Sequence, residues 1–279
     1  MQELSQRSSW KKPERQRGGV VHEAVFEDRL DRNLGWALTE GSLFFEGKGA
    51  VQETLRKICQ RLRELGIPYA VVGGMALFSH GLRRFTEDVD LLVTADALKV
   101  IHQALDGLGY LPPFSHSKNL RDTVTGVKIE FLITGGFPGD GKPKPVAFPD
   151  PMEVTVEKEG IHYLNLPTLI ELKLASGMTN VDRMKDLVDV LELIKILLLP
   201  LAFADNLNPY VREKYRELWA AARPSEKRYL REKGILTSEV QQAMLADGVR
   251  FDAEREIFET SDPTIAAKYD MHDESEFMT

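Results

Sequence analysis

One short segment, residues 69–93, constrains this chain more than any other, because two adjacent glycines and two closely spaced aspartates lie within it. The apolar residues 69–72 stop at Gly73-Gly74, which is typical of a buried strand that ends in a turn. Since glycine has no Cβ, the backbone at this turn can approach a bulky ligand closely. A short helix is predicted over residues 75–80, and its first N–H groups would face that ligand and favour phosphate.

Asp88 and Asp90 are predicted to share one face of a second strand, residues 88–93, because residues two apart on a strand point the same way. Two adjacent carboxylates repel each other unless a cation lies between them. Mg²⁺ suits such a site, since it prefers oxygen ligands from one or two carboxylates and from substrate phosphates. The glycines and the aspartates together therefore predict a metal-bound nucleoside triphosphate.

These residues resemble a known signature. Gly73-Gly74, a spacer and Asp88-x-Asp90 look like the motif of the DNA polymerase beta-type nucleotidyltransferase superfamily. Residues 84–87, Arg-Phe-Thr-Glu, resemble its small bacterial members, among them the abortive-infection AbiEii-type toxins. The resemblance implies an α/β (α+β) fold in which helices flank a mixed sheet, followed by a C-terminal helical region. It also implies that an acceptor hydroxyl attacks the α-phosphate of a nucleoside triphosphate, ATP being one candidate, with two Mg²⁺ ions bound.

Glu130 lies in residues 127–133, where apolar and polar side chains alternate as in a strand. It falls where the resembled superfamily keeps its third carboxylate, a position that is often Asp. The resemblance implies that Glu130 is a metal ligand with Asp88 and Asp90, and that these three residues are catalytic. Whether Glu130 also accepts the proton of the acceptor stays open, and an exposed strand glutamate without a role is the alternative.

A second motif is predicted on two helices, residues 167–177 and 181–198. Lys173, and then Arg183 and Asp186 followed by Asp189, resemble the second motif of the AbiEii-type enzymes. The resemblance implies that Lys173 reaches the triphosphate while Asp186 and its neighbours orient it. An amphipathic helix with ordinary ion pairs is the alternative. The nucleotide-binding residues that the resemblance implies are Gly73, Gly74, Arg84, Thr86, Lys173, Arg183 and Asp186.

The remaining segments are predicted from local patterns. Helices are expected at residues 51–66, 95–108, 209–223, 225–233 and 237–246, an edge strand at 42–45, a loop at 135–151, and a hairpin at 152–156 and 161–164. The chain then divides into a disordered basic arm (1–20), a nucleotidyltransferase core (21–165), a C-terminal helical region (166–250) and an acidic tail (251–279). The tail carries nine acidic and two basic residues, which accounts for the whole net charge of −7.

Composition and missing motifs exclude several classes. One cysteine, Cys59, excludes a disulfide framework and a cysteine-rich zinc site. No apolar run is long enough to span a bilayer, and the polar N-terminus lacks the apolar core of a secretion signal, so we expect a cytoplasmic protein that does not bind membranes. The glycine-rich loop fails the dinucleotide-binding pattern, and no nucleophile motif of a hydrolase is present.

The acceptor is left open by the sequence. The AbiEii resemblance favours the 3′ end of an RNA or a protein, with the chain as the toxin of a toxin–antitoxin or phage-defence system and a cognate antitoxin as a partner. A small molecule such as an aminoglycoside is another candidate acceptor. A non-catalytic nucleotide-binding antitoxin or regulator, and a helical adaptor built on residues 201–279, are the alternatives from other classes.

Overall fold

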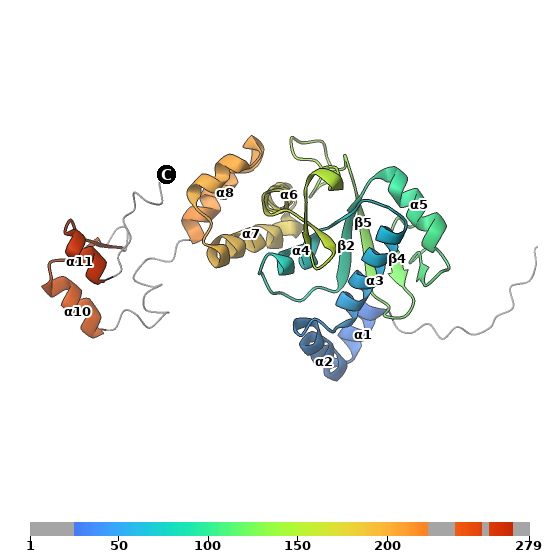
Figure 1. Ribbon diagram of the computed structural model, residues 1–279, viewed down its shortest axis with the longest axis horizontal. Helices are drawn as coiled ribbons and strands as arrows, with labels where there is room; N and C mark the ends of the chain where they lie inside the picture. Colours follow the sequence, from blue (N-terminus) through green and yellow to red (C-terminus); the bar gives the residue numbers. More distant parts are fainter. Residues whose placement is uncertain (1–24, 223–237, 253–256, 270–279) are drawn as a thin grey trace, which may run out of the picture.

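The computed structural model describes residues 25–222, 238–252 and 257–269. The predicted basic arm, the predicted helix at 225–233 and the last ten residues lie outside the described residues. Figure 1 shows a central sheet with helices packed on both of its faces, as predicted for a mixed α/β fold.

The sheet has seven strands in the order β3-β4-β5-β2-β1-β7-β6. Its strands are β1 (Ala70–Val71), β2 (Asp88–Val93), β3 (Tyr110–Leu111), β4 (Leu120–Asp122), β5 (Lys128–Ile133), β6 (Thr155–Lys158) and β7 (Ile161–Leu164). The pairs β2–β5 and β1–β7 are parallel, whereas the other neighbours are antiparallel. The sheet is therefore mixed, and its centre carries the strand with both aspartates.

One face of the sheet packs against the helices from the first part of the chain. These are α1 (Phe26–Arg32), α2 (Leu34–Phe45), α3 (Ala50–Glu64) and α5 (Ala95–Leu105). Leu55, Ile58 and Leu62 recur at helical spacing on α3 and are buried against Leu91 and Phe131 of the sheet. This first core therefore holds β2 and β5 in place from the face of the sheet that carries α3.

The opposite face packs against helices that mostly follow the sheet in sequence. They are α6 (Leu166–Thr179), α7 (Met184–Leu197) and α8 (Pro209–Ala222), together with part of α4 (Gly73–Ser79). Asn165 caps α6 by accepting a hydrogen bond from the Thr168 N–H at 3.0 Å, and Pro167 lies in the first turn, where a missing N–H costs nothing. Leu92 points into this second core. Asp88 and Asp90 alternate in step with Leu92, so they face the same side.

The described residues from 238 onward have a small core of their own, which is formed by Met244, Val249 and Phe258. Their elements are α10 (Ser238–Ala246), β8 (Arg250–Asp252), β9 (Ile257–Glu259) and α11 (Pro263–Lys268). The described part of the acidic segment thus contains most of two antiparallel strands and a short helix. The boundaries of the four predicted regions stay predictions.

Most predicted elements are found within a few residues of their expected positions, with three short 3₁₀ turns at Pro151–Glu153, Val181–Arg183 and Leu201–Asn206. The predicted edge strand at 42–45 is wrong, because α2 continues to Phe45. Asn33 caps this helix through the Trp36 N–H at 3.0 Å, and Phe44 packs on Phe78 and Phe85. A short apolar run is ambiguous between strand and helix, and here the aromatic contacts favour the helix.

The predicted loop at 135–151 is irregular, but it is held to the body of the protein. Gly139 has φ +75°, and a Cβ there would lie 2.7 Å from the Ser176 carbonyl oxygen on α6. The Lys144 ammonium is almost fully buried and donates to Asp140 and to Thr179. This loop therefore rests on the end of α6. None of the helices among the described residues is long and apolar enough to cross a bilayer.

Candidate metal and nucleotide site

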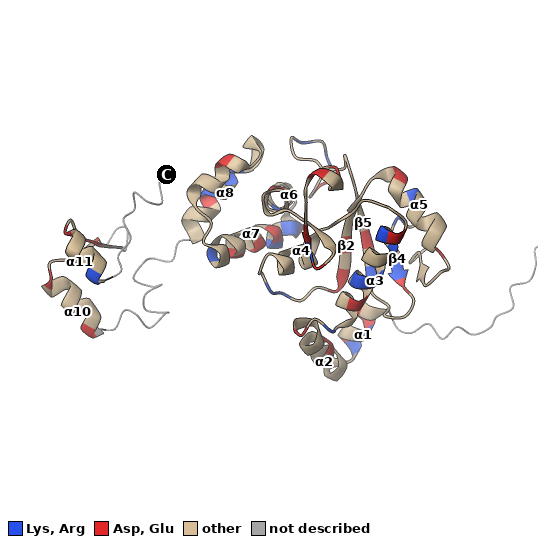
Figure 2. Ribbon diagram, viewed as in Figure 1, with Lys and Arg blue, Asp and Glu red and all other residues tan. Residues whose placement is uncertain are grey.

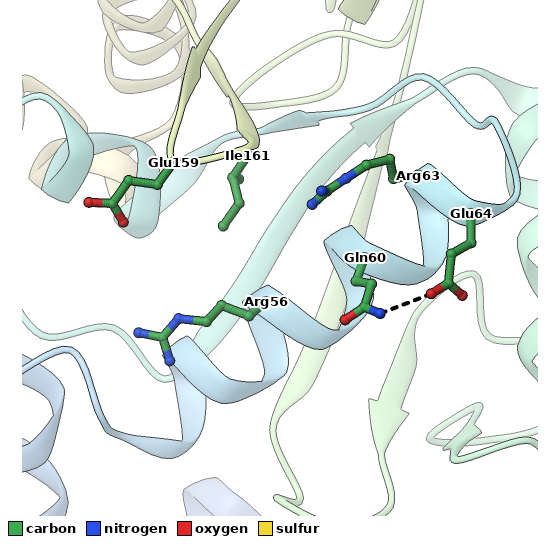
Figure 3. A pocket seen from close by; sticks show the side chains of 6 residues that line it. All are labelled: Arg56, Gln60, Arg63, Glu64, Glu159 and Ile161. Atoms are coloured by element: carbon green, nitrogen blue, oxygen red, sulfur yellow. Dashed lines mark hydrogen bonds between the residues drawn. The ribbon is translucent and has the colours of Figure 1, made fainter.

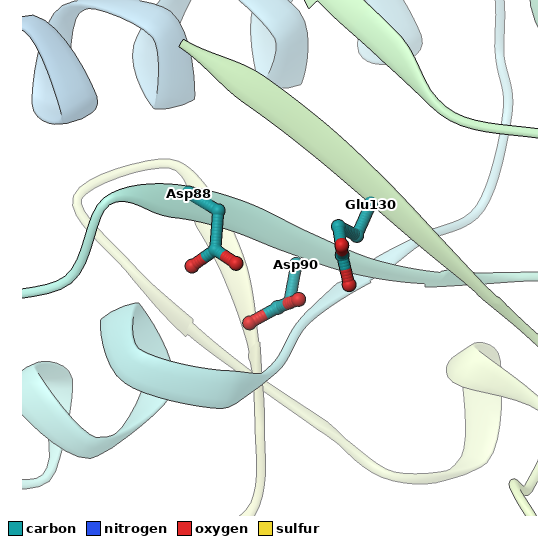
Figure 4. Close-up of side chains that lie close together, drawn as sticks. All are labelled: Asp88, Asp90 and Glu130. Carbon is teal, nitrogen blue, oxygen red and sulfur yellow. The ribbon is translucent and has the colours of Figure 1, made fainter. Parts of the chain in front are cut away.

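Three carboxylates converge on the face of the sheet that carries α6 and α7. Asp90 and Glu130 are register partners across the parallel pair β2–β5, and Asp88 pairs in the same way with Lys128. One carboxylate oxygen from each of Asp88, Asp90 and Glu130 lies within 4.8 Å of the others. Figure 4 shows the three side chains turned into a common space, and Figure 2 shows the acidic positions on these adjacent strands. The carboxylates that the sequence predicted to share a site are thus brought together.

The electrostatics of this acid cluster favour a bound cation. Burial raises the pKa of Asp90 from 3.8 to about 7, and the negative charges of Asp88 and Glu130 add to this effect. The positive charges of Lys173 and Arg183 oppose it without cancelling it. Three hard oxygen donors whose negative charges are only partly offset by neighbouring cations are the donor set that Mg²⁺ prefers. The residues therefore fit the predicted metal.

Gly73 is required by the acid cluster itself. Its φ is +58°, a conformation that glycine adopts without strain, and a Cβ would lie 1.8 Å from Asp90 Oδ2. Gly74 has a similar role, because its Cβ would lie 2.6 Å from Thr86 Cβ. The Thr86 hydroxyl donates to Asp88 Oδ1 at 2.9 Å. The backbone at Gly73, where helix α4 begins, therefore lies beside the Asp90 carboxylate. Glycine is needed here for this close approach, whether or not the same backbone also contacts a ligand.

The second motif forms a buried network of charges between α6 and α7. The Lys173 ammonium donates to Asp186 Oδ1 at 2.8 Å and to Asp189 Oδ2 at 2.7 Å. Ser176 Oγ donates to Asp186 Oδ2 at 2.7 Å. Burial acts to raise the pKa of Asp186, but the Lys173 charge and the two hydrogen bonds outweigh it, so the pKa is lowered. Asp186 is therefore held as a carboxylate.

Arg84 extends this network toward the acid cluster. Its guanidinium lies 2.9 Å from Asp189 Oδ1 through Nε and donates to Asp189 Oδ2 at 3.0 Å. Asp189 thus holds two cations from different parts of the chain. Two residues after Arg84 along the same segment, Thr86 contacts Asp88. The network therefore joins α7 to the strand that carries Asp88 and Asp90.

The predicted nucleotide-binding residues are gathered here, but their charges are not equally available. The cations of Lys173 and Arg84 are already paired with carboxylates. Arg183 is exposed, and within the described residues it forms no ion pair. Its charge opposes the rise in the pKa of Asp90 and contributes to the lowered pKa of Asp186. Of the predicted cations, Arg183 is therefore the one whose charge is free beside the acid cluster.

Three residues of this region are absent from the predicted site: Lys128, Ser176 and Asp189. Lys128 shares the face of Glu130 by the period-two rule, and Ser176 lies one helical turn after Lys173, so spacing alone marks both positions. Asp189 belongs to the recognised spacing of three, but a carboxylate between two cations is not evident from the sequence.

A separate groove of about 540 Å³ lies between α3 and the β6–β7 hairpin. Arg56 and Arg63 line it, and Figure 3 shows Arg63 extended toward Ile161 of the hairpin, while Gln60 donates to Glu64 at 2.9 Å on the same helix. The groove shares no residue with the acid cluster. It presents both signs of charge and carries none of the predicted catalytic residues.

Comparisons with known proteins find structural similarity at low sequence identity. No known family matches the chain, and no curated protein matches it. A candidate nucleotidyltransferase from Thermotoga maritima is 21% identical, with a TM-score of 0.35 over 50% of this chain and 91% of that one. The Helicobacter pylori protein JHP933 is 19% identical, with a TM-score of 0.37 over 71% and 95%. ANT(2″)-Ia in complex with adenylyl-2″-tobramycin is 12% identical, with a TM-score of 0.37 over 61% and 95%. Likenesses at this level assign neither a family nor an activity to the chain.

Proposed function

We propose that this protein is a Mg²⁺-dependent nucleotidyltransferase that moves a nucleoside monophosphate from a nucleoside triphosphate to an acceptor hydroxyl. The observation that carries the proposal is the convergence of Asp88, Asp90 and Glu130 from two neighbouring strands into one cluster of hard oxygen donors. A protein that only binds a nucleotide has no evident need for three half-buried carboxylates that repel one another at one site.

In the proposed reaction the acceptor oxygen forms a bond to the α-phosphorus, and the bond from that phosphorus to the bridging oxygen of the β-phosphate breaks. Pyrophosphate leaves with the electron pair, and the proton of the acceptor hydroxyl passes to a base. We assign this base to Glu130, whose carboxylate faces the same space as the two aspartates. Mg²⁺ bound to the three carboxylates would supply positive charge to the phosphate oxygens and make the hydroxyl a better nucleophile.

The triphosphate is proposed to lie between the Gly73-Gly74 turn and the start of α7. The glycine backbone lies against Asp90, so its N–H groups are beside the metal ligands. Arg183 is the cation best suited to contact the phosphates directly, because its charge is not used by another side chain of the described residues. Lys173 would have to leave two carboxylates to do the same. We therefore propose that Lys173 and Asp186, with Arg84 and Thr86, shape this site from its edge.

The acceptor is proposed to be an RNA 3′ end or a protein hydroxyl in the cytoplasm, with the chain acting as the toxin of a toxin–antitoxin or phage-defence system. This part rests on the resemblance of Arg84-Phe-Thr-Glu87 and of the Lys173 and Asp186 motif to the AbiEii-type enzymes. A small-molecule acceptor and a non-catalytic regulator are the outcomes that the same assay can return instead.

Transfer of label tests the proposal. The full chain is incubated with Mg²⁺, each α-labelled nucleoside triphosphate in turn, and bacterial RNA and protein. Asp88→Asn/Asp90→Asn is the inactive comparison, and Asp96→Asn, which changes an exposed carboxylate on α5, is the matched control. Label on RNA or protein with wild type and Asp96→Asn alone would support transfer and name the acceptor class. Equal labelling by the double variant would refute the role of the acid cluster.

A further inference from the structure

Lys128 is a cation within the acid cluster that the proposed mechanism does not use. It lies two residues before Glu130 on β5, so both side chains project from the same face of the sheet. Its register partner on β2 is Asp88. The Lys128 ammonium forms an ion pair with Glu130 Oε1, and about 30% of each side chain is exposed.

This direct ion pair distinguishes Lys128 from the other cations near the cluster. Lys173 and Arg183 influence the pKa of Asp90 through space, and Lys173 is fully engaged by two aspartates on α7. Within the described residues, Lys128 alone is paired directly with one of the three clustered carboxylates. Its ammonium therefore contacts an oxygen that a divalent cation would need.

We propose that Lys128 is a positioning residue that holds Glu130 and competes with the divalent cation, so that the acid cluster binds the cation weakly until a nucleoside triphosphate arrives. This inference rests on the proposed function of the cluster. Without nucleotide, the ammonium neutralises part of the charge that attracts the cation. With nucleotide, the phosphate oxygens supply further ligands for the cation and another partner for the ammonium, so the competition is relieved.

The size of the effect follows from Coulomb's law. A single charge and a double charge about 5 Å apart repel each other enough, even at the dielectric constant of water, to weaken binding by roughly tenfold. An ordinary ion pair on a protein surface would behave differently, because it contributes little and has no reason to respond to a divalent cation. The two interpretations therefore differ in a measurable binding constant.

The experiment measures binding of Mn²⁺, as a spectroscopic probe for Mg²⁺, to the full chain by electron paramagnetic resonance, with and without a non-hydrolysable nucleoside triphosphate analogue. Lys128→Gln is compared with wild type and with Lys128→Arg, which keeps the charge. Lys99→Gln is the matched control, because Lys99 forms an exposed ion pair with Asp96 on α5. Thermal denaturation of each variant confirms that it is folded.

We expect Lys128→Gln to bind Mn²⁺ alone about tenfold more tightly than wild type, with Lys128→Arg and Lys99→Gln near the wild-type value. The difference in Mn²⁺ affinity between Lys128→Gln and wild type should become smaller when the analogue is present. Equal affinity of wild type and Lys128→Gln for Mn²⁺ alone would overturn the inference and leave the proposed function intact. Absence of Mn²⁺ binding by all variants, with and without the analogue, would overturn both.

Discussion

Asp90 and Glu130 lie forty residues apart in the sequence and are direct register partners across two parallel strands. Parallel pairing places both side chains on the same face at the same height, so their charges oppose each other across the strand boundary. Asp88 extends the negative charge along β2. The metal-free cluster is therefore strained electrostatically, and this strain has consequences for stability that can be measured apart from activity.

Asp90→Asn is expected to stabilise the metal-free protein. Burial and the charges of Asp88 and Glu130 disfavour the Asp90 carboxylate, as the rise of its pKa to about 7 shows. At pH 8 in the presence of a chelator, removal of this charge should raise the free energy of unfolding by roughly 1–3 kcal/mol, since one pKa unit corresponds to about 1.4 kcal/mol. Urea denaturation measures the difference.

Addition of Mg²⁺ provides the internal control for this variant. If the acid cluster binds Mg²⁺ as proposed, wild type should gain stability as Mg²⁺ is added, because a cation bound to the folded state stabilises it, whereas Asp90→Asn should gain much less. A variant that is less stable than wild type in chelator would contradict the view that the three carboxylates repel one another in the metal-free protein.

Gly73→Ala is expected to disrupt the acid cluster. A Cβ at this position would lie 1.8 Å from Asp90 Oδ2, and the residue has φ +58°. We expect a loss of roughly 1–3 kcal/mol in stability and a loss of divalent-cation binding, because the Asp90 carboxylate must move away. Calorimetric titration with Mn²⁺ and urea denaturation measure the two effects.

Gly81→Ala separates the collision from the backbone strain. Gly81 also has a positive φ, +99°, but a Cβ there would meet open space. We therefore expect Gly81→Ala to lower stability while the affinity for Mn²⁺ stays near the wild-type value. If Gly73→Ala retained full Mn²⁺ affinity, the close approach of this glycine to Asp90 would not matter for the site.

Lys173→Met is expected to destabilise the protein strongly. The ammonium lies between Asp186 and Asp189, and all three side chains are at most 10% exposed. Removal of one partner from a buried ionic network leaves charge uncompensated and typically costs about 3–5 kcal/mol. Lys195→Met, which removes a surface ion pair with Glu192 within α7, should cost less than about 1 kcal/mol.

Urea denaturation of the two lysine variants, together with their KM for the nucleoside triphosphate, distinguishes two roles for Lys173. A large loss of stability would identify it as the cation that holds α6 and α7 together beside the site. Wild-type stability with a strongly raised KM for the nucleoside triphosphate would instead favour the direct phosphate contact that the sequence motif implies.

His80 is expected to make the protein less stable in mild acid. Burial lowers the pKa of His80 below its ordinary value of 6.5, and the Lys158 charge adds to this, although the hydrogen bond of its ring to the Leu164 carbonyl oxygen acts in the opposite direction. The contribution of neutral His80 to the free energy of unfolding is complete above pH 6.5. It is lost as the pH falls toward the pKa of His80 in the folded protein, because the unfolded chain then binds the proton more tightly. Urea denaturation between about pH 7.5 and 5.5 measures the slope.

His80→Gln provides the comparison for this pH dependence. Glutamine can keep a hydrogen bond to the Leu164 carbonyl oxygen but does not titrate in this range. The difference in unfolding free energy between wild type and His80→Gln should therefore change with pH in the direction that penalises wild type in acid. A constant difference across the range would exclude His80 as the titrating group.

Local rules were sufficient for the elements that carry the site. The period of two placed Asp88 and Asp90 on one face of β2, and the period of 3.6 placed the buried face of α3, because both depend only on the geometry of neighbouring residues. The same rules failed at residues 42–45, which were predicted as an edge strand and belong to α2. There, a run of three apolar residues is compatible with either period, and contacts to distant aromatic side chains decided in favour of a helix.

The sequence by itself determined which chemical groups are available: two glycines, two aspartates at strand spacing, a third carboxylate on an alternating segment, and a lysine and aspartates on later helices. Only the tertiary structure decided which of these groups meet. Sheet register brought Glu130 to Asp90 and Lys128 to Glu130, and helix packing enclosed the Lys173 charge between Asp186 and Asp189. The physical reason is that charges act over a few ångströms in space, whereas spacing along the chain fixes distances only within one helix or strand.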